Sequence, residues 1–473
     1  MQTMLNQIFT LMRAEWMLTL IIFILLFIKV GSNGWKKEPL LNLIMLLLLV
    51  NFLAGFFSCP NGSLFGDMYR SSALTNLEKN MLNGGTLIIS MLAYPWLQHQ
   101  EHVEEFFLLL LSTLLGMFFM ISSYNLLMFY LGLELSTIPL AALANFDLAK
   151  RKSSEAAFKF IISSAFSSGL LLFGISLVYG ITGSLGFGDI AQHADSNPLL
   201  LFAFILLFAG FGFKISVVPF HLWTADVYEG SPVAITAYLS VISKGAIFFV
   251  LVPVLYTVFK PLAETWYRML LLLSILTMLT GNLFALRQQN MKRLLAFSSI
   301  AQVGFILVGI SGSSKMGSAS VVYFILIYIF SNLGAFGVVA VISALTGKEN
   351  LGDYKGLYHS NPALAWMLAI SLFSLAGIPP VAGFFGKFFL LMAGAGKGNY
   401  GLIIIAALNM IVSLYYYLNV VRVILMDKND EPLAKLNLAL WPRLALWVCM
   451  AGMIITGLAG SIYDYIYSLS TGF

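Results

Sequence analysis

Apolar stretches long enough to cross a membrane recur along the whole chain, and this pattern constrains the fold more than any other feature. A helix needs roughly 20 apolar residues to span the hydrocarbon core of a bilayer. Fourteen such stretches can be counted: 15–30, 39–57, 75–97, 103–121, 123–146, 154–180, 198–220, 232–258, 265–286, 293–312, 317–346, 363–392, 400–426 and 439–468. The sequence therefore predicts an all-α polytopic membrane protein of about fourteen transmembrane helices. The third is the least regular, because Glu78 and Lys79 interrupt it.

The scarcity of charge supports the same fold class. Of the 473 residues, 59% are hydrophobic and 10% are charged, whereas soluble proteins carry about 25% charged residues. A chain of this composition cannot cover a water-facing surface, which excludes a soluble enzyme, a nucleic-acid-binding protein and a disordered chain. The longest polar stretch, about 58–74, is too short to fold alone.

The basic residues outside the spans predict the orientation. With an even number of helices and the N-terminus outside, fifteen Lys and Arg residues fall on the inner side and seven, Lys79 among them, on the outer side. Because basic residues concentrate on the cytoplasmic side, both termini are expected on the non-cytoplasmic side of the cell (inner) membrane. The net charge of +5 has the same origin, and no nucleic-acid partner is expected.

A few charges fall inside the apolar spans. They are Lys159, Lys214, Lys244 and Lys387, together with the mid-span carboxylate Glu134. A charge at the bilayer centre costs at least about 2.5–3.5 kcal/mol on insertion scales and marks an ion or proton pathway by default. These five residues are therefore the first candidates for a proton relay.

Simpler interpretations exist for each candidate. Long lysine side chains can reach the membrane interface, an explanation strongest for Lys159, whose span begins only a few residues earlier. Glu134 could form a static pair between two helices. His221 could be a core histidine, but its position just after Pro219 and between Lys214 and Lys244 favours a relay.

Other polar residues allow two interpretations. Small polar side chains in two of the predicted helices could order water or could form hydrogen bonds between helices: Ser163, Ser164, Ser167, Ser168, Ser298, Ser299 and Gln302. Asp226 and Glu229 fall in the connection before Ser231, where a solvated loop explains them.

Prolines predict breaks in the seventh and twelfth helices. Pro219 follows Lys214 by five residues, and Pro379-Pro380 precedes Lys387; proline removes a backbone hydrogen bond and breaks or kinks a helix. Broken helices at matching places in two halves indicate an inverted-repeat transporter. The breaks lie five helices apart, so helices 4–8 and 9–13 would be two five-helix repeats, inverted because five is odd. The predicted parts are 1–100, which holds helices 1–3, the repeats 101–260 and 261–430, and 431–473, which holds the last helix.

No cofactor or metal site is expected on this chain. Cys59 and Cys449 are too few for a disulfide framework, a zinc site or an iron–sulfur cluster. Of the five histidines only His221 lies in a long apolar segment, so a membrane haem with two axial histidines is excluded. Gly210-Phe-Gly212 lacks the third glycine of a dinucleotide site.

Three long motifs resemble those of a known family. They are Phe213-Lys-Ile-Ser-Val-Val-Pro-Phe-His-Leu-Trp-Thr-Ala-Asp-Val-Tyr-Glu-Gly-Ser-Pro232, followed by Ser243-Lys-Gly; Met291-Lys-Arg-Leu-Leu-Ala-Phe-Ser-Ser-Ile-Ala-Gln-Val-Gly304; and Leu375-Ala-Gly-Ile-Pro-Pro-Val-Ala-Gly-Phe-Phe-Gly-Lys-Phe388. They are similar to the core of the proton-translocating antiporter-like subunits of respiratory complex I and of multi-subunit cation/proton antiporters. The resemblance covers roughly residues 100–430. Within the family the chain most resembles subunit N of NADH-quinone oxidoreductase, because subunit M and its antiporter counterpart carry glutamate where this chain has Lys387.

The resemblance implies a role for each candidate. Glu134 and Lys214 would form the input pair, Lys244 the central relay with His221 nearby, and Lys387 the outlet. Lys159 would belong to the half-channel that opens to the cytoplasm.

It also implies partners. Electron transfer from NADH to quinone, with FMN and iron–sulfur clusters, would take place in other subunits. The neighbours would be subunit M and the small membrane subunits, and the contact with the hydrophilic NADH-oxidising arm would be indirect. The alternatives are a subunit of a cation/proton antiporter, a subunit of a membrane-bound hydrogenase, and a scaffold that moves no ions.

Overall fold

The computed structural model describes residues 2–31, 35–57, 59–193, 197–312, 315–429 and 432–470, and this part of the chain is mostly helical. The first half contains α1 (Gln2–Leu11), α2 (Arg13–Gly31), α3 (Lys37–Ala54), the strands β1 (Gly62–Leu64) and β2 (Tyr69–Ser71), α4 (Ala73–Leu97), α5 (Val103–Ile121), α6 (Leu126–Ala144), α7 (Arg151–Thr182), α8 (Phe187–His193), α9 (Pro198–Ile215), α10 (Leu222–Gly230), α11 (Val233–Tyr238), η1 (Leu239–Ser243), α12 (Lys244–Pro253) and η2 (Val254–Val258). The second half contains η3 (Lys260–Leu262), α13 (Ala263–Ala285), α14 (Met291–Ser311), α15 (Lys315–Thr346), η4 (Leu351–Tyr354), α16 (Leu357–Ser360), α17 (Pro362–Ala376), α18 (Ala382–Ala395), α19 (Tyr400–Leu425), α20 (Leu440–Leu458) and α21 (Gly460–Leu469).

The helices confirm a polytopic membrane protein. Within the described residues, twelve helices are long and apolar enough to cross a bilayer. The predicted third span is the 25-residue α4, which is not among the twelve. The predicted twelfth span consists of two shorter apolar helices, α17 and α18. The count of fourteen therefore stays a prediction.

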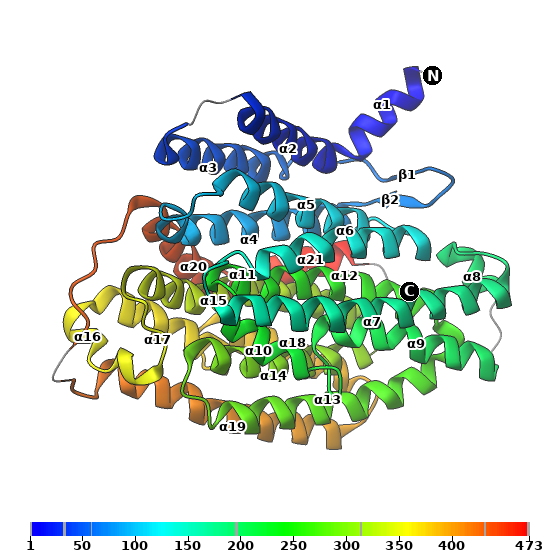
Figure 1. Cartoon of the computed structure of the whole chain (residues 1–473). Coiled ribbons are helices and arrows are strands. Elements are labelled where there is room, and N and C mark those ends of the chain that lie inside the picture. The colour runs from blue at the N-terminus through cyan, green and yellow to red at the C-terminus, as the bar shows by residue number, and fades with distance from the viewer. Residues whose placement is uncertain are drawn as a thin grey trace.

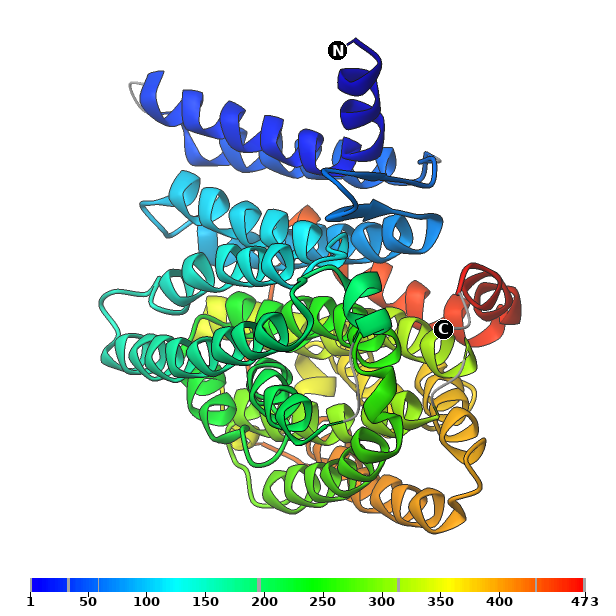
Figure 2. The ribbon, with the colours of Figure 1, turned by 90° about the vertical axis from the view of Figure 1, so that its right-hand side faces the viewer.

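Figures 1 and 2 show the helices packed side by side in layers. The N-terminal helices α2 and α3 lie along one side of the molecule over α4 and α5, and α13 and α19 lie along the opposite side. Between these sides, α14 is buried along its whole spanning window and α15 along most of it. These two helices form the centre of the bundle.

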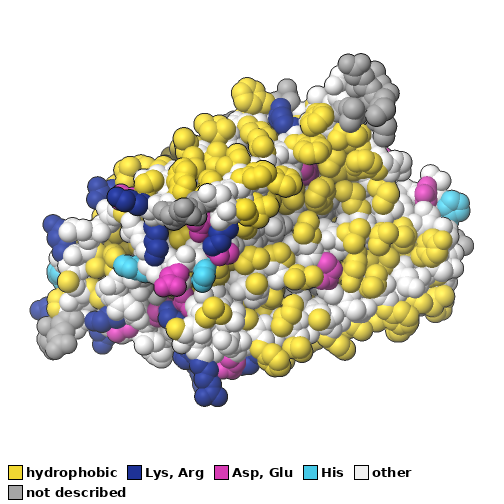
Figure 3. Space-filling view, turned by 45° about the horizontal axis from the view of Figure 1, so that its top comes forward, with side chains coloured by type: hydrophobic (Ala, Val, Ile, Leu, Met, Phe, Trp, Pro, Cys, Tyr) yellow, Lys and Arg dark blue, Asp and Glu magenta, His cyan; other side chains and the backbone are white. Residues whose placement is uncertain are grey.

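The surface is divided as a bilayer requires. Figure 3 shows large hydrophobic side chains over most of the visible face, with the charged side chains gathered mainly at one end of the molecule. Apolar residues can face lipid along the flank, whereas charged side chains need the aqueous boundary.

Two helix breaks confirm the prediction from the prolines, but each helix ends earlier than its apolar stretch. Helix α9 ends at Ile215, and Ser216 follows with a positive φ of 65°. Helix α17 ends at Ala376, and Gly377 follows with a φ of 86°. Both left-handed residues close the helix with their own N–H groups and turn the chain out of the helix axis.

A third irregularity was not predicted. The π-helical turn η1 ends at Ser243, directly before Lys244. Such turns occur frequently at functional sites. Within the stretch 58–74, predicted only as polar, residues 62–71 form the antiparallel hairpin β1–β2.

Candidate functional site

The buried Lys214 lies at the end of α9, one residue before the first break. Its ammonium group donates hydrogen bonds to Thr137 Oγ1 at 2.5 Å and to Ser164 Oγ at 2.9 Å. Glu134, one turn before Thr137 on α6, acts on Lys214 electrostatically. The Oε1 atom of Glu134 is buried and has no hydrogen-bond partner among the described residues. Hydroxyl groups rather than a direct carboxylate contact therefore hold Lys214 in place.

Lys244 begins α12 and is buried at the centre of the bundle. Its Nζ donates to Ser299 Oγ at 2.7 Å and lies 5.5 Å from the centre of the Tyr228 ring. A small cavity of about 10 Å³ lies beside it, lined in part by Ser299, Gln302 and Tyr328. This volume is about what one water molecule needs.

Lys387 is buried in α18 and faces the second break. Its Nζ donates to the carbonyl oxygens of Leu375 at 2.7 Å and Ala376 at 3.3 Å. These carbonyls are free because α17 ends there and the last turn of a helix leaves its C=O groups unpaired. The break therefore provides the acceptors that a buried ammonium group requires.

One face of α14 connects Lys244 to Lys387. Ser299 accepts from Lys244, and Gln302, three residues later on the same face, donates to the Leu375 carbonyl at 3.0 Å. Lys387 donates to that same carbonyl. Ser299 and Gln302 both make hydrogen bonds between helices, as one of the two interpretations predicted, and these bonds lie between two buried lysines.

Lys159 differs from the other three lysines. Its side chain is 40% exposed and forms ion pairs with Glu155 at 2.8 Å and Asp226 at 2.7 Å. A cavity of about 190 Å³ lies beside these groups. Lys159 lies within the candidate span α7, and its side chain is partly exposed, which agrees with the interpretation that its long stem reaches the edge of the helix bundle.

Asp226 and Glu229 were predicted to lie in a solvated loop, and this was wrong. Both lie on α10 and are bound by Arg293 of α14, at 2.8 and 3.0 Å respectively. Lys152 also contacts Glu229. The carboxylates therefore join α7, α10 and α14 into one charged cluster beside the Lys159 cavity.

His221 lies between the first break and α10. It is half-buried, and its Nδ1 atom has no hydrogen-bond partner among the described residues. The hydrogen bonds of the described residues do not connect Lys214 to Lys244. A relay through His221 and water therefore stays a prediction.

Several polar residues that the motifs did not single out complete the interior. Tyr417 of α19 contacts both Ser298 and Gln302. Ser240, Tyr328 and Asn332 form hydrogen bonds with one another one turn from Lys244. The sequence feature that could have identified them is a tyrosine or an amide side chain within an apolar helix. In lipid such a side chain needs a hydrogen-bond partner inside the protein.

Comparisons with known proteins show the family of this chain. Residues 123–413 match the family model described as NADH:quinone oxidoreductase/Mrp antiporter, TM. NADH-quinone oxidoreductase subunit N of Azobacteroides pseudotrichonymphae is 43% identical over 463 residues, which cover 96% of each chain. The subunit N of Phocaeicola vulgatus is also 43% identical, over 96% of this chain and 97% of its own.

Solved structures share the fold. A chain of respiratory complex I from Thermus thermophilus with bound aureothin has a TM-score of 0.82 at 27% identity, covering 97% of this chain and 100% of its own. A chain of the Mrp complex from Dietzia sp. DQ12-45-1b has a TM-score of 0.84 at 19% identity, covering 97% of this chain and 96% of its own. The matched motifs and the nearly full-length relatives lead to one conclusion: this chain belongs to the NADH:quinone oxidoreductase/Mrp antiporter family of membrane subunits, in the branch of NADH-quinone oxidoreductase subunit N.

Proposed function

We propose that this chain is the proton-translocating subunit of an NADH:quinone oxidoreductase complex. The observation that carries the proposal is the connection from Lys244 through Ser299 and Gln302 to Lys387. It places two buried groups that can gain or lose a proton at the two ends of one polar face of α14, on which Ser299 and Gln302 lie about one helical turn apart. A purely structural bundle has no need for buried lysines, because burying a charge is costly.

The proposed sequence of events begins at Glu134 and Lys214. A change of charge near Glu134 alters how strongly Lys214 holds its proton, since opposite charges favour the ionised forms. Lys214 then passes a proton through His221 and ordered water to Lys244. From there it moves along the α14 face to Lys387 and to the outer side. Moving one charge against 100 mV requires about 2.3 kcal/mol.

We place proton entry at the Lys159 cavity. Lys159, Asp226 and Arg293 lie together at one end of the bundle, and the basic residues of the neighbouring loops predict that this end faces the cytoplasm. In this orientation both termini lie on the non-cytoplasmic side of the inner membrane.

The two breaks support the proposed inverted repeats. In the structure's labels, the first repeat (101–260) holds α5, α6, α7, the pair α9–α10 and α11–α12. The second (261–430) holds α13, α14, α15, the pair α17–α18 and α19. Each repeat has its break in the fourth position, with a left-handed residue at the end of the first half-helix and a buried lysine nearby. The boundaries 1–100 and 431–473 leave α1–α4 and α20–α21 outside the repeats.

The redox steps would take place in other subunits of the complex. Electron transfer from NADH through FMN and iron–sulfur clusters to quinone would take place in other subunits, and the direct neighbours would be subunit M and the small membrane subunits. This chain would itself contribute proton transfer but no redox step.

Purification of the assembled complex tests this assignment. The expected result is co-purification with flavin- and iron–sulfur-containing subunits, and proton pumping on addition of NADH. An ion-exchanging complex without redox subunits would instead support the antiporter alternative, and bound nickel the hydrogenase alternative.

A Glu134→Gln substitution tests the input pair. We expect it to lower proton pumping by this subunit by about tenfold without abolishing it, the factor that corresponds to roughly 1.4 kcal/mol of lost interaction. The hydroxyl partners of Lys214 stay in place. The measurement is the number of protons pumped per NADH oxidised in vesicles, with Glu101→Gln as the control because Glu101 is exposed. An unchanged ratio would remove Glu134 from the mechanism.

A further inference from the structure

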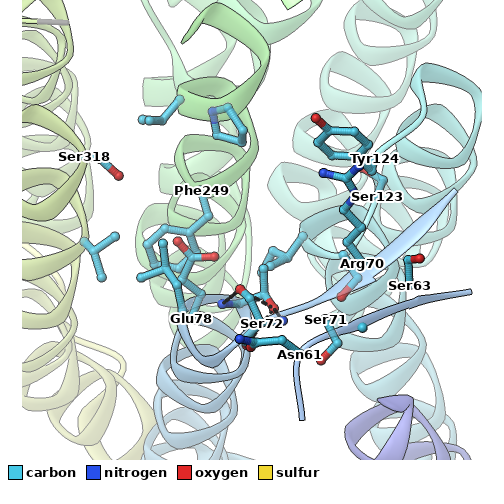
Figure 4. A pocket seen from close by; sticks show the side chains of 18 of the residues that line it. Asn61, Ser63, Arg70, Ser71, Ser72, Glu78, Ser123, Tyr124, Phe249 and Ser318 are labelled. Atoms are coloured by element: carbon cyan, nitrogen blue, oxygen red, sulfur yellow. Dashed lines mark hydrogen bonds between the residues drawn. The ribbon is translucent and has the colours of Figure 1, made fainter. Parts of the chain in front are cut away.

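A second, larger cavity has no part in the mechanism above. It has a volume of about 650 Å³ and lies between the hairpin β1–β2, the start of α4, the end of α12 and the start of α15 (Figure 4). The cavity of about 470 Å³ beside Lys152 and Lys292 is lined instead by the ends of α4 and α15. The two cavities therefore lie at opposite ends of α4 and α15, and in the proposed orientation the larger one lies on the outer side.

A buried carboxylate without a partner lies inside this outer cavity. Glu78 is only 5% exposed and makes neither a hydrogen bond nor an ion pair among the described residues. Figure 4 shows its carboxyl group beside Phe249, within the cavity. Since an unpaired buried carboxylate is costly in its ionised form, Glu78 needs a proton or a cation.

The other charges near Glu78 already have partners. Lys79 is bound to Glu15 at 2.6 Å and acts on Glu78 only electrostatically. Arg70 binds Asp67 at the rim of the cavity, and this hydrogen bond lowers the pKa of the Asp67 carboxyl below its usual value. Glu78 is therefore the carboxylate of this cavity that is left to exchange a proton.

The packing of α4 against α12 places Glu78 close to the level of Lys244. Gly245, next to Lys244, faces Leu82: a Cβ atom added to Gly245 would lie 3.6 Å from Leu82 Cδ2. Glu78 lies one helical turn before Leu82, since four residues make about one turn. It therefore lies one turn from the central lysine along the α4–α12 contact.

One residue lines both the cavity beside Lys244 and the outer cavity. The buried ring of Phe248 lines both the small cavity beside Lys244 and the outer cavity that holds Glu78.

We propose that Glu78 is a second proton-release site, which takes protons from Lys244 past Phe248 and delivers them to the outer cavity, beside the route through Lys387. In this step an N–H bond of the Lys244 ammonium breaks, one water in the small cavity relays the proton, and an O–H bond forms on the Glu78 carboxylate. Glu78 then releases the proton to water in the outer cavity. The inference rests on the proposed function, because it needs Lys244 to carry protons.

Single and double substitutions in the assembled complex test the order of the groups. We expect Glu78→Gln to lower the protons pumped per NADH by a part of the loss caused by Lys244→Ala. Combined with Lys244→Ala it should cause no further loss of pumping, because groups on one route act in series and their effects do not add. Combined with Lys387→Ala it should cause a further loss, because the effects of blocking two parallel routes add. Glu264→Gln, which removes an exposed carboxylate, is the matched control.

The outcomes separate the two proposals. Normal pumping by Lys244→Ala would contradict the proposed function itself. A defect in Lys244→Ala together with normal pumping by assembled Glu78→Gln would overturn only the release site. Glutamine keeps the shape of the side chain and removes an unpaired charge, so the substitution should not prevent assembly.

The Phe248 contact has its own test. Phe248→Ala is expected to raise the passive proton leak of vesicles without NADH, and Glu78→Gln in the same chain is expected to suppress that leak. A leak that Glu78→Gln leaves unchanged would contradict the route. Dependence of the leak on sodium rather than on protons would identify Glu78 as a cation site and overturn the proposal as stated.

Discussion

A complex in which Lys244 is replaced by alanine is expected to oxidise NADH while this subunit pumps almost no protons. Lys244 donates to Ser299 on the polar face of α14, and Gln302 on the same face shares the Leu375 carbonyl with Lys387. Alanine leaves Ser299 and the small cavity without a proton donor. We expect the proton flux through the subunit to fall by about a hundredfold or more, the factor that a positioned proton-transfer group supplies. The measurement is the ratio of protons pumped to NADH oxidised in sealed vesicles.

Lys244→Arg separates a proton relay from a fixed positive charge. Arginine keeps the charge but does not release its proton in proteins, so it should be as defective as alanine. Rescue by arginine would mean that only the charge matters, and the relay would then be wrong. Lys348→Ala is the control, because Lys348 is exposed. Co-purification of each variant with the other subunits establishes that it is assembled.

Much of the fold could be predicted because the relevant information is local in the sequence. Each apolar stretch identifies a helix through its own composition, and Pro219 and Pro379 identify breaks through their own covalent structure. The positions at which α9 and α17 end could not be predicted in this way. Apolar residues continue beyond Ile215 and Ala376, and the helix ends depend on a left-handed residue rather than on hydropathy.

The π-helical turn before Lys244 also has no local signal. Neither proline nor glycine occurs in Leu239–Ser243. Its geometry depends on how this segment packs between α4 and α15, which are distant in the sequence.

The sequence identified the lysines of the candidate site but not the residues that they contact. Lysines within apolar runs are visible in any single sequence, so Lys214, Lys244 and Lys387 could be named. The partners of two of them are not visible, because Ser299 lies 55 residues from Lys244 and Thr137 lies 77 residues from Lys214. The same limit applies to Lys159, whose partner Asp226 is 67 residues away.

The burial of Lys79 was not predicted. It was counted among the outer residues that set the orientation, because Glu78 and the polar residues after it make its span irregular. The structure buries the Lys79 side chain at 2% exposure against Glu15 of α2, with a contact of 2.6 Å. Tyr69 of β2 donates to Glu15 and accepts from Lys79. Glu15 of α2 therefore meets residues of β2 and α4 that lie 54 and 64 residues later in the sequence, in one buried polar cluster.

Breaking this cluster is expected to have the largest effect on stability. Glu15→Gln leaves the Lys79 ammonium group buried without its counter-charge, and removing one partner of a buried pair typically costs about 3–5 kcal/mol. The packing of α2 against the rest of the bundle should weaken by this amount. The measurement is the temperature at which the subunit is lost from the purified complex, compared between the parent and the variant.

Removing both partners of the Glu15–Lys79 pair should cost less stability than removing one of them. In the double variant Glu15→Gln/Lys79→Met no uncompensated charge remains, so much of the lost stability should return. The matched control is Glu105→Gln, which breaks the exposed ion pair that joins α2 to α5 through Lys29. Solvent screens such a pair, and the control should change stability little. A Glu15→Gln complex that is as stable as the control would mean that the buried cluster does not hold α2 in place, and the N-terminal helices would then depend on apolar packing alone.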